Sequence, residues 1–288
     1  MARDFPKTTA VAMRIGINTY SPLFSGASKL AFACWAYADT FNTGAADNRL
    51  WTNLINNSIG GTFLMVDGSL TPKVLRITGR SNDTETSETA WATSEFTTGT
   101  WHHCGGVIDI GGDIITVYMD GVEEASNAVT FTNTTYTVSG SPATTNADNI
   151  GGSYEGGAAT SLLWDGRIAE FAIWKDTVPS AADFAAMAKG YSPLMFAPNG
   201  LIDYFPLIGK KSPETSLIST RIGTITGSIP AAAHPRVYLP GGIFVPPIGP
   251  TAAASLIKTI NSLARASIKT VNGLAIASVK TINGVTNV

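Results

Sequence analysis

The feature that most constrains the fold is a succession of short β-type runs between residues 28 and 174. Each run alternates apolar with polar residues or is rich in β-branched ones, and clusters of Gly, Asn, Asp and Ser separate the runs. The pattern is typical of an all-β domain, because branched side chains suit a pleated surface and the separating residues favour tight turns. The predicted strands are 31–37, 61–66, 73–78, 101–110, 113–120, 128–132 and 165–174.

Residues 108–125 predict two successive β-hairpins. Gly-Gly at 111–112 and Asp-Gly at 120–121 can adopt the positive φ that two-residue turns require. Alternation divides the strand between them into an apolar face, Ile115, Val117 and Met119, and a mixed face, Ile114, Thr116, Tyr118 and Asp120. We therefore expect the apolar face to be turned towards a core.

One helix is predicted between Pro179 and Gly190. Ser180 can cap its first turn, Asp183 lies where the helix dipole favours an acid, and Gly190 can end it. Spacings of three and four residues give the helix one apolar stripe, formed by Phe184, Met187 and Ala188. We expect this stripe to pack on the β domain.

Further strand-like runs at 201–207 and 221–227 precede a Pro/Gly-rich stretch at 234–250. Prolines at this density exclude a central strand and favour extended chain. The predicted organisation is an N-terminal segment 1–27, a β domain 28–208, an extended arm 209–250 and a tail 251–288.

The tail contains three segments that align at a period of eleven, 257–267, 268–278 and 279–288. On a helix this period would produce one apolar stripe and a right-handed supercoil. Asn-Gly at 272–273 and 283–284 instead indicates type I′ hairpins, and Ile, Val and Thr dominate the rest of the repeat. We favour strands, while the helix stays an open alternative.

Neither structure lets three short repeats bury both of their apolar sides alone. The tail is therefore predicted to be an oligomerisation and attachment segment, whose partner is another copy of the chain, with a trimer expected, or a larger assembly. The residues predicted to form this surface are Lys258, Ile260, Asn261, Lys269, Val271, Asn272, Lys280, Ile282 and Asn283.

Composition excludes several classes of partner. Only 14% of residues are charged, and 19 basic against 21 acidic residues leave a net charge of −2, so the basic face of a nucleic-acid binder is not expected. No apolar run approaches the length of about 18 residues that a membrane span needs. Residues 1–14 lack the apolar stretch of a secretory signal, so we expect synthesis in a cytoplasm. Cys34 and Cys104 fit no disulfide framework or metal spacing, which indicates small buried side chains.

Three segments resemble the laminin-G-like, concanavalin A-type jelly rolls. Residues 98–125 hold a Trp-His-His strand that leads through a hairpin to a Tyr-x-Asp-Gly turn. Residues 166–190 are similar to the family's last strand and short helix, and residues 32–41 resemble its first core strand. The resemblance implies a sandwich of two curved sheets over about residues 25–190.

The remainder, from 198 to the repeats, resembles the segments C-terminal to such domains in proteins of tailed bacteriophages and their prophages. This resemblance implies a non-enzymatic virion structural protein, assembled in the host cytoplasm with the major capsid protein as a partner. We favour a capsid decoration or head-fibre protein. A tail appendage or an adhesin for host glycans is the alternative, and a polysaccharide-degrading tail enzyme is the least favoured.

Concanavalin A-type jelly rolls also include glycoside hydrolases, whose retaining members hold two carboxylates about 5 Å apart. The motif that the resemblance implies, Glu-x-Asp-x-x-Glu, is absent from the sequence. Two pairs of acids come nearest, Asp165 with Glu170 and Glu123 with Glu124. Their odd spacings place the members of each pair on opposite faces of a regular strand, so no catalytic site is predicted.

The histidines offer a metal or acid–base cluster only if His102 and His103 converge with Asp109 or Asp113. Alternation sends the two imidazoles to opposite faces, which favours a framework role. His234 has no partner that the sequence identifies.

No resident cofactor is predicted, although the resemblance allows Ca²⁺ at a loop rim, held by carboxylates. The loop acids that could bind it are Asp39, Asp47, Asp67 and Asp148, and no spacing selects among them. The aromatic residues that could stack on a glycan are Trp51, Trp91, Tyr154 and Trp164. For most of these four, a core or subunit contact is the favoured role.

Overall fold

The computed structural model describes residues 2–6, 12–16, 21–41, 47–54, 60–82, 84–138, 148–155, 158–159, 162–209, 212–226 and 228–238, and six dipeptides between 259 and 286. The chain divides into two compact units, Met1–Pro247 and Ile248–Val288.

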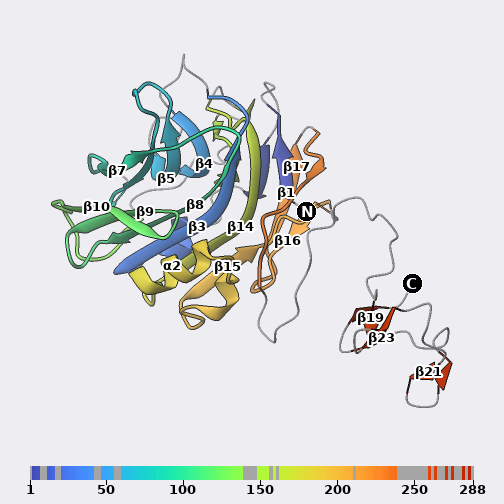
Figure 1. Ribbon diagram of the computed structural model, residues 1–288. Helices are drawn as coiled ribbons and strands as arrows, with labels where there is room; N and C mark the ends of the chain where they lie inside the picture. The colour runs from blue at the N-terminus through green and yellow to red at the C-terminus, as the bar shows by residue number, and fades with distance from the viewer. Residues whose placement is uncertain are drawn as a thin grey trace. The chain divides into compact units, whose positions relative to one another are not determined.

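Two antiparallel sheets form the first unit (Figure 1). The first sheet has the order β10-β9-β8-β3-β14-β1-β18, with β15 also paired to β14. Its strands are β1 (Ala2–Phe5), β3 (Lys29–Ala38), β8 (Trp101–Asp109), β9 (Ile114–Met119), β10 (Val122–Ala128), β14 (Gly166–Lys175), β15 (Leu201–Phe205) and β18 (Ala231–Ala232).

The second sheet has the order β16-β17-β2-β11-β4-β5-β6-β7. Its strands are β2 (Ala12–Gly16), β4 (Asp47–Leu54), β5 (Gly60–Asp67), β6 (Val74–Gly79), β7 (Glu88–Glu95), β11 (Asp148–Ile150), β16 (Glu214–Thr215) and β17 (Ile222–Thr226). The remaining elements of this unit are β12 (Tyr154–Glu155), β13 (Ala158–Ala159), the short helix α1 (Ser21–Phe24), helix α2 (Ala181–Ala188) and the 3-10 turn η1 (Pro193–Met195).

The main core lies between the two sheets, because every second residue of their strands points inward. Leu64 and Val66 of β5 meet Phe32 and Cys34 of β3 in one buried cluster. Trp51 is fully buried there, with its ring centroid 4.9 Å from that of Phe171. The sandwich class predicted from the runs of alternating residues is confirmed.

The predicted hairpins and faces of residues 108–125 are confirmed, but the first turn is not the predicted two-residue turn at Gly111 and Gly112. Asp109 pairs with Ile114, so four residues connect the strands, and the positive φ of 54° belongs to Asp113. Asp120 and Gly121 have φ values of 52° and 81°, which is the geometry of a type I′ turn. Val117 and its neighbours on the same face are buried in the main core, while Tyr118 on the other face packs under α2. Local alternation was therefore sufficient to define this part of the fold.

The predicted helix is confirmed as α2. The Ser180 hydroxyl accepts from the Asp183 backbone, and the Asp183 side chain accepts from the Ser180 backbone, which forms a capping box. Phe184 stacks on Tyr118 with a centroid distance of 4.3 Å. The helix therefore covers part of the first sheet on the side that faces away from the second (Figure 1).

The sandwich extends beyond the predicted residues 28–208 at both ends. Strands β1 and β2, and β16 to β18, lie within the two sheets, although they come from the predicted N-terminal segment and arm. Their partners are distant in sequence, so no local pattern records the pairing. Within the predicted domain five strands were missed, β4, β7, β11, β12 and β13. The predicted strand 128–132 was wrong, because β10 ends at Ala128.

The second unit contains three two-stranded hairpins. They pair β19 (Thr259–Ile260) with β20 (Leu263–Ala264), β21 (Thr270–Val271) with β22 (Leu274–Ala275), and β23 (Thr281–Ile282) with β24 (Val285–Thr286). The strand interpretation of the repeats is thus confirmed over the helical alternative. Ile260, Val271 and Ile282 occupy equivalent strand positions. Lys258, Asn261, Lys269, Asn272, Lys280 and Asn283 lie outside the described residues.

Among the described residues, the helices are too short to span a bilayer.

Candidate ligand-binding site on the second sheet

The second sheet carries a polar side on the face turned away from the core. Leu75 and Ile77 of β6 point inward, so Arg76 between them points outward. We call the outward side chains of β4 to β7 the polar face. Its members are Asp47, Arg49, Phe63, Met65, Asp67, Arg76, Thr78, Thr89 and Trp91.

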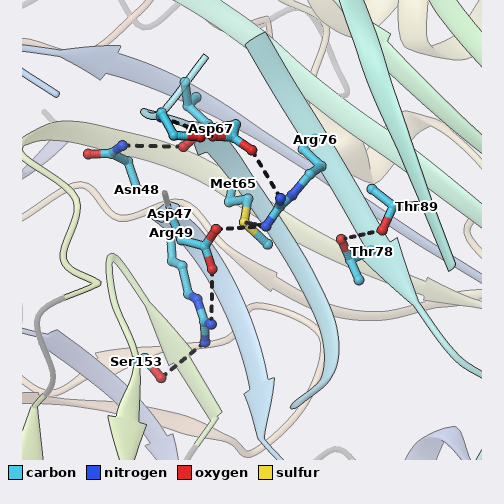
Figure 2. A network of polar contacts seen from close by, with 11 residues as sticks. Asp47, Asn48, Arg49, Met65, Asp67, Arg76, Thr78, Thr89 and Ser153 are labelled. Atoms are coloured by element: carbon cyan, nitrogen blue, oxygen red, sulfur yellow. Dashed lines mark hydrogen bonds and ion pairs between the residues drawn. The ribbon is translucent and has the colours of Figure 1, made fainter. Parts of the chain in front are cut away.

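Arg76 is the centre of this face (Figure 2). Its Nη2 donates to Asp47 Oδ1 at 2.7 Å and its Nη1 donates to Asp67 Oδ2 at 3.0 Å. Strand register makes this possible, because Asp47 is paired with Asp67 and Met65 is paired with Arg76. The guanidinium therefore holds two carboxylates from neighbouring strands in fixed positions.

A second arginine extends the network. Arg49 Nη2 donates to Asp47 Oδ2 and Nη1 donates to Ser153 Oγ, both at 3.2 Å (Figure 2). The Arg49 guanidinium lies 4.1 Å above the centre of the Phe63 ring. Thr52, paired with Phe63, is fully buried, and its hydroxyl has no hydrogen-bond partner among the described residues.

An exposed indole borders the network. Trp91 of β7 is the cross-strand neighbour of Arg76 and is 43% exposed, whereas Ala90 and Ala92 beside it are buried in the core. The site thus combines an aromatic ring with fixed hydrogen-bond donors and acceptors. Two guanidinium groups balance two carboxylates, so the face carries little net charge.

Of the four acids considered for Ca²⁺, the structure brings two together, Asp47 and Asp67, and Arg76 lies between them. Asp148 is buried and accepts from Asn53 Nδ2 at 2.5 Å. Asp39 lies 3.9 Å from Arg167. No group of three metal-ligating side chains occurs among the described residues.

Of the four aromatic candidates, Trp51 and Trp164 belong to the core, at 0% and 1% exposure. Trp91 is the candidate that reaches the surface. The side chain of Tyr154 lies outside the described residues. The core role favoured for most of the four is therefore correct for two of them.

His102 and His103 lie on opposite sides of β8, as predicted. The carboxylate near them is Asp120, whose Oδ2 lies 2.7 Å from His102 Nδ1, while Asp109 pairs with Lys29. Burial acts to raise the pKa of Asp120, but hydrogen bonds from His102 and from the His103 backbone outweigh it and lower the pKa. Burial lowers the pKa of His103 to about 4, so its ring is neutral.

The third histidine has a partner that the sequence did not reveal. His234 Nε2 lies 3.0 Å from Glu170 Oε1, across the first sheet. Cys34 and Cys104 are buried, as predicted, and face each other in register on β3 and β8. Burial and the neighbouring thiol raise the pKa of Cys104.

The acids weighed for catalysis each have a different hydrogen-bond donor. Asp165 accepts from the Thr40 hydroxyl, and Glu170 accepts from the Tyr204 hydroxyl. Glu123 accepts from the Tyr118 hydroxyl at 3.1 Å, and Glu124 accepts from the Thr93 and Ser94 side chains. The structure therefore gives the members of neither pair a common partner.

Comparisons with known proteins agree with this architecture. Residues 14–182 match a sequence model described as the concanavalin A-like lectin/glucanases superfamily. The curated proteins gave no match. Among solved structures, a proposed carbohydrate-binding protein from Bacteroides ovatus is similar at a TM-score of 0.56 and 16% identity. The similarity covers 79% of this chain, which spans 58% of that protein's length.

Two further structures are similar at a TM-score of 0.49, and each similarity covers 65% of this chain. One is a heptameric SAP-like pentraxin from Limulus polyphemus, at 13% identity over 81% of its length. The other is the CBM40 of a Ruminococcus gnavus IT-sialidase bound to α2,3-sialyllactose, at 11% identity over 98% of its length. At these identities the likeness concerns the fold.

Proposed function

Because the chain belongs to the concanavalin A-like lectin/glucanases superfamily, we propose that it is a non-enzymatic glycan-binding protein that takes a saccharide on the polar face. The observation that carries the proposal is the position of Arg76. It holds Asp47 and Asp67 apart in fixed geometry, directly beside the exposed ring of Trp91.

The chemistry of this face suits a sugar. Each hydroxyl of a pyranose can donate to a carboxylate and accept from a guanidinium, and its C–H face can pack on an indole. Because Arg76 already orients both carboxylates, little side-chain freedom has to be lost on binding. A near-neutral face also favours a polar, uncharged ligand.

The same geometry supports a binding role over hydrolysis. A glycoside hydrolase needs one of its two carboxyl groups protonated, to act on the leaving oxygen. Asp47 and Asp67 both form ion pairs with one guanidinium, at 2.7 and 3.0 Å. This arrangement offers both carboxylates as hydrogen-bond acceptors.

A glycan array probed with the full-length chain tests the proposal, once in buffer with Ca²⁺ and once with a chelator. Binding in both conditions is expected, because the polar face needs no metal. Trp91→Ala should lose the signal, while Tyr191→Ala should keep it, since Tyr191 is equally exposed, at 42%, and lies after α2, outside the second sheet. Silence of the wild-type chain in both conditions would refute glycan binding.

A second candidate is a structural protein of a bacteriophage particle, which displays the sandwich and attaches through the tail. The three hairpins of the second unit favour it, because two-residue strands in separate pairs are not stable alone and need a partner surface. In this role the chain assembles in the host cytoplasm, contacts the major capsid protein and forms a homo-oligomer, which we take to be a trimer.

Deleting residues 251–288 tests the second candidate. The shortened chain should remain soluble, become monomeric in light scattering and no longer join particles. Incorporation at the wild-type level would refute an attachment role. Mass spectrometry of purified particles then gives its copy number relative to the major capsid protein, and a high number indicates capsid decoration.

A further inference from the structure

We infer that the first sheet carries a second saccharide site on its own outward face, specific for neutral sugars and independent of the polar face. The site is built from outward side chains of β3 and β8, which we call the aromatic face. Its members are Trp35, Tyr37, Trp101 and His103.

Strand register assembles the aromatic face from two adjacent cross-strand pairs. Tyr37 is paired with Trp101, and their ring centroids are 5.7 Å apart in an edge-to-face arrangement. Trp35 is paired with His103 in the same way, at 5.3 Å. Trp35, Tyr37 and Trp101 are only partly buried, so their rings remain in reach of a ligand.

The residues of the aromatic face are not part of the buried cluster beneath helix α2. Phe184 of α2 lies over Gly105 and packs with Ala33 and Ala172, which form the next row along the strands. The partly exposed rings begin directly beyond that row, at Trp35. The same sheet face is thus divided into a half packed against a helix and a half lined by rings.

Hydrogen-bonding groups border the rings. The Arg167 guanidinium lies 4.4 Å above the centre of the Tyr37 ring, and this contact fixes the orientation of the guanidinium. Its distance to Asp39 is 3.9 Å, too long for a hydrogen bond, and the Arg167 side chain is 28% exposed. The guanidinium therefore has donors to offer to sugar hydroxyls.

The local charge selects the kind of sugar. Burial, followed by the nearby Asp39 and Asp165, raises the pKa of Asp4, and Arg167 acts against this shift. Asp39 lies 3.9 Å from Arg167, and Asp4 is the cross-strand neighbour of Arg167, so carboxyl groups outnumber the guanidinium here. A uronic acid or a sialic acid would bring a further negative charge into this group, whereas a neutral hexose adds hydroxyls that can donate to the carboxylates. Neutral hexose oligosaccharides are therefore the expected ligands.

Fluorine NMR of the full-length chain labelled with 5-fluorotryptophan separates the two sites. The six tryptophans give six resonances, which single Trp→Phe variants assign. The probes are cellohexaose, laminarihexaose, maltohexaose and hexagalacturonate. Trp101 and Trp35 report on the aromatic face, Trp91 reports on the polar face, and buried Trp51 and Trp174 serve as internal controls.

At least one neutral hexaose is expected to shift Trp101 and Trp35, and the shift should persist in Trp91→Phe. Tyr37→Leu should weaken this response about tenfold, the effect of losing one stacked ring, while unchanged Trp51 and Trp174 resonances verify its fold. Movement of Trp91 alone would overturn the second site and leave the proposed function intact. No response of Trp101 and Trp35 to any neutral probe, or a response to hexagalacturonate, would also overturn it.

Discussion

His234 Nε2 lies 3.0 Å from Glu170 Oε1, which joins the segment after β18 to the middle of β14. The other ring nitrogen, Nδ1, lies 2.6 Å from the Pro235 carbonyl oxygen. Both ring nitrogens thus face oxygen atoms. Glu170 also accepts from the Tyr204 hydroxyl, so one buried side chain contacts both β15 and the segment after β18.

Replacing His234 by Ala should therefore lower the free energy of unfolding by about 1 to 3 kcal/mol, because it removes one partner of the buried Glu170 side chain. Urea unfolding of His234→Ala, Glu170→Gln and the double variant measures the coupling. The double variant should lose less than the sum of the single variants. Strictly additive losses would show that the two side chains do not interact.

The buried His103 ring should make the free energy of unfolding depend on pH. Its pKa is about 4 in the folded chain against an ordinary value of 6.5, so the unfolded chain takes up the extra proton between these values. The contribution of the neutral ring is complete above pH 6.5 and is lost as the pH falls towards 4. The loss amounts to about 3 kcal/mol.

Unfolding curves of the wild type and His103→Phe at pH 7, 5.5 and 4.5 test this dependence. The wild type should lose stability over this range more steeply than the variant, in which no imidazole titrates at this position. Parallel curves would mean that His103 accepts a proton without unfolding.

The contact between Gly105 and Phe184 gives a test of how closely α2 packs on β8. A Cβ at position 105 would lie 2.5 Å from Phe184 Cε1, closer than real atoms approach. Gly105→Ala should therefore destabilise the sandwich by about 1 to 3 kcal/mol through overpacking. The double variant Gly105→Ala, Phe184→Leu should recover part of this loss in thermal unfolding. A neutral Gly105→Ala would place α2 farther from β8.

Local sequence patterns sufficed where an element depends on its own neighbours. The strand around Val117, the Asp-Gly turn at 120–121 and the capped helix α2 are of this kind. Strand β4 was missed because a bulge after Arg49 places the adjacent Leu50 and Trp51 both in the core, which breaks the alternation. Strand β7 was missed because its core residues, Ala90 and Ala92, are small and give a weak strand signal.

The candidate site was found only in pieces. Asp47, Asp67 and Trp91 were candidates for separate roles, and strand register was needed to bring them to one guanidinium. A signal for Arg76 was present, since a charged residue between Leu75 and Ile77 in a predicted strand must point away from the core. The pairing of His234 with Glu170 left no local trace, because it joins segments distant in the chain.

The most direct test of the central claim is a calorimetric titration of the full-length chain with the oligosaccharide that gives the strongest array signal. The wild type and Tyr191→Ala should bind with equal affinity, and Trp91→Ala should bind at least about tenfold more weakly, because a stacked ring is lost. Equal affinity of Trp91→Ala and the wild type would contradict the assignment of glycan binding to the polar face.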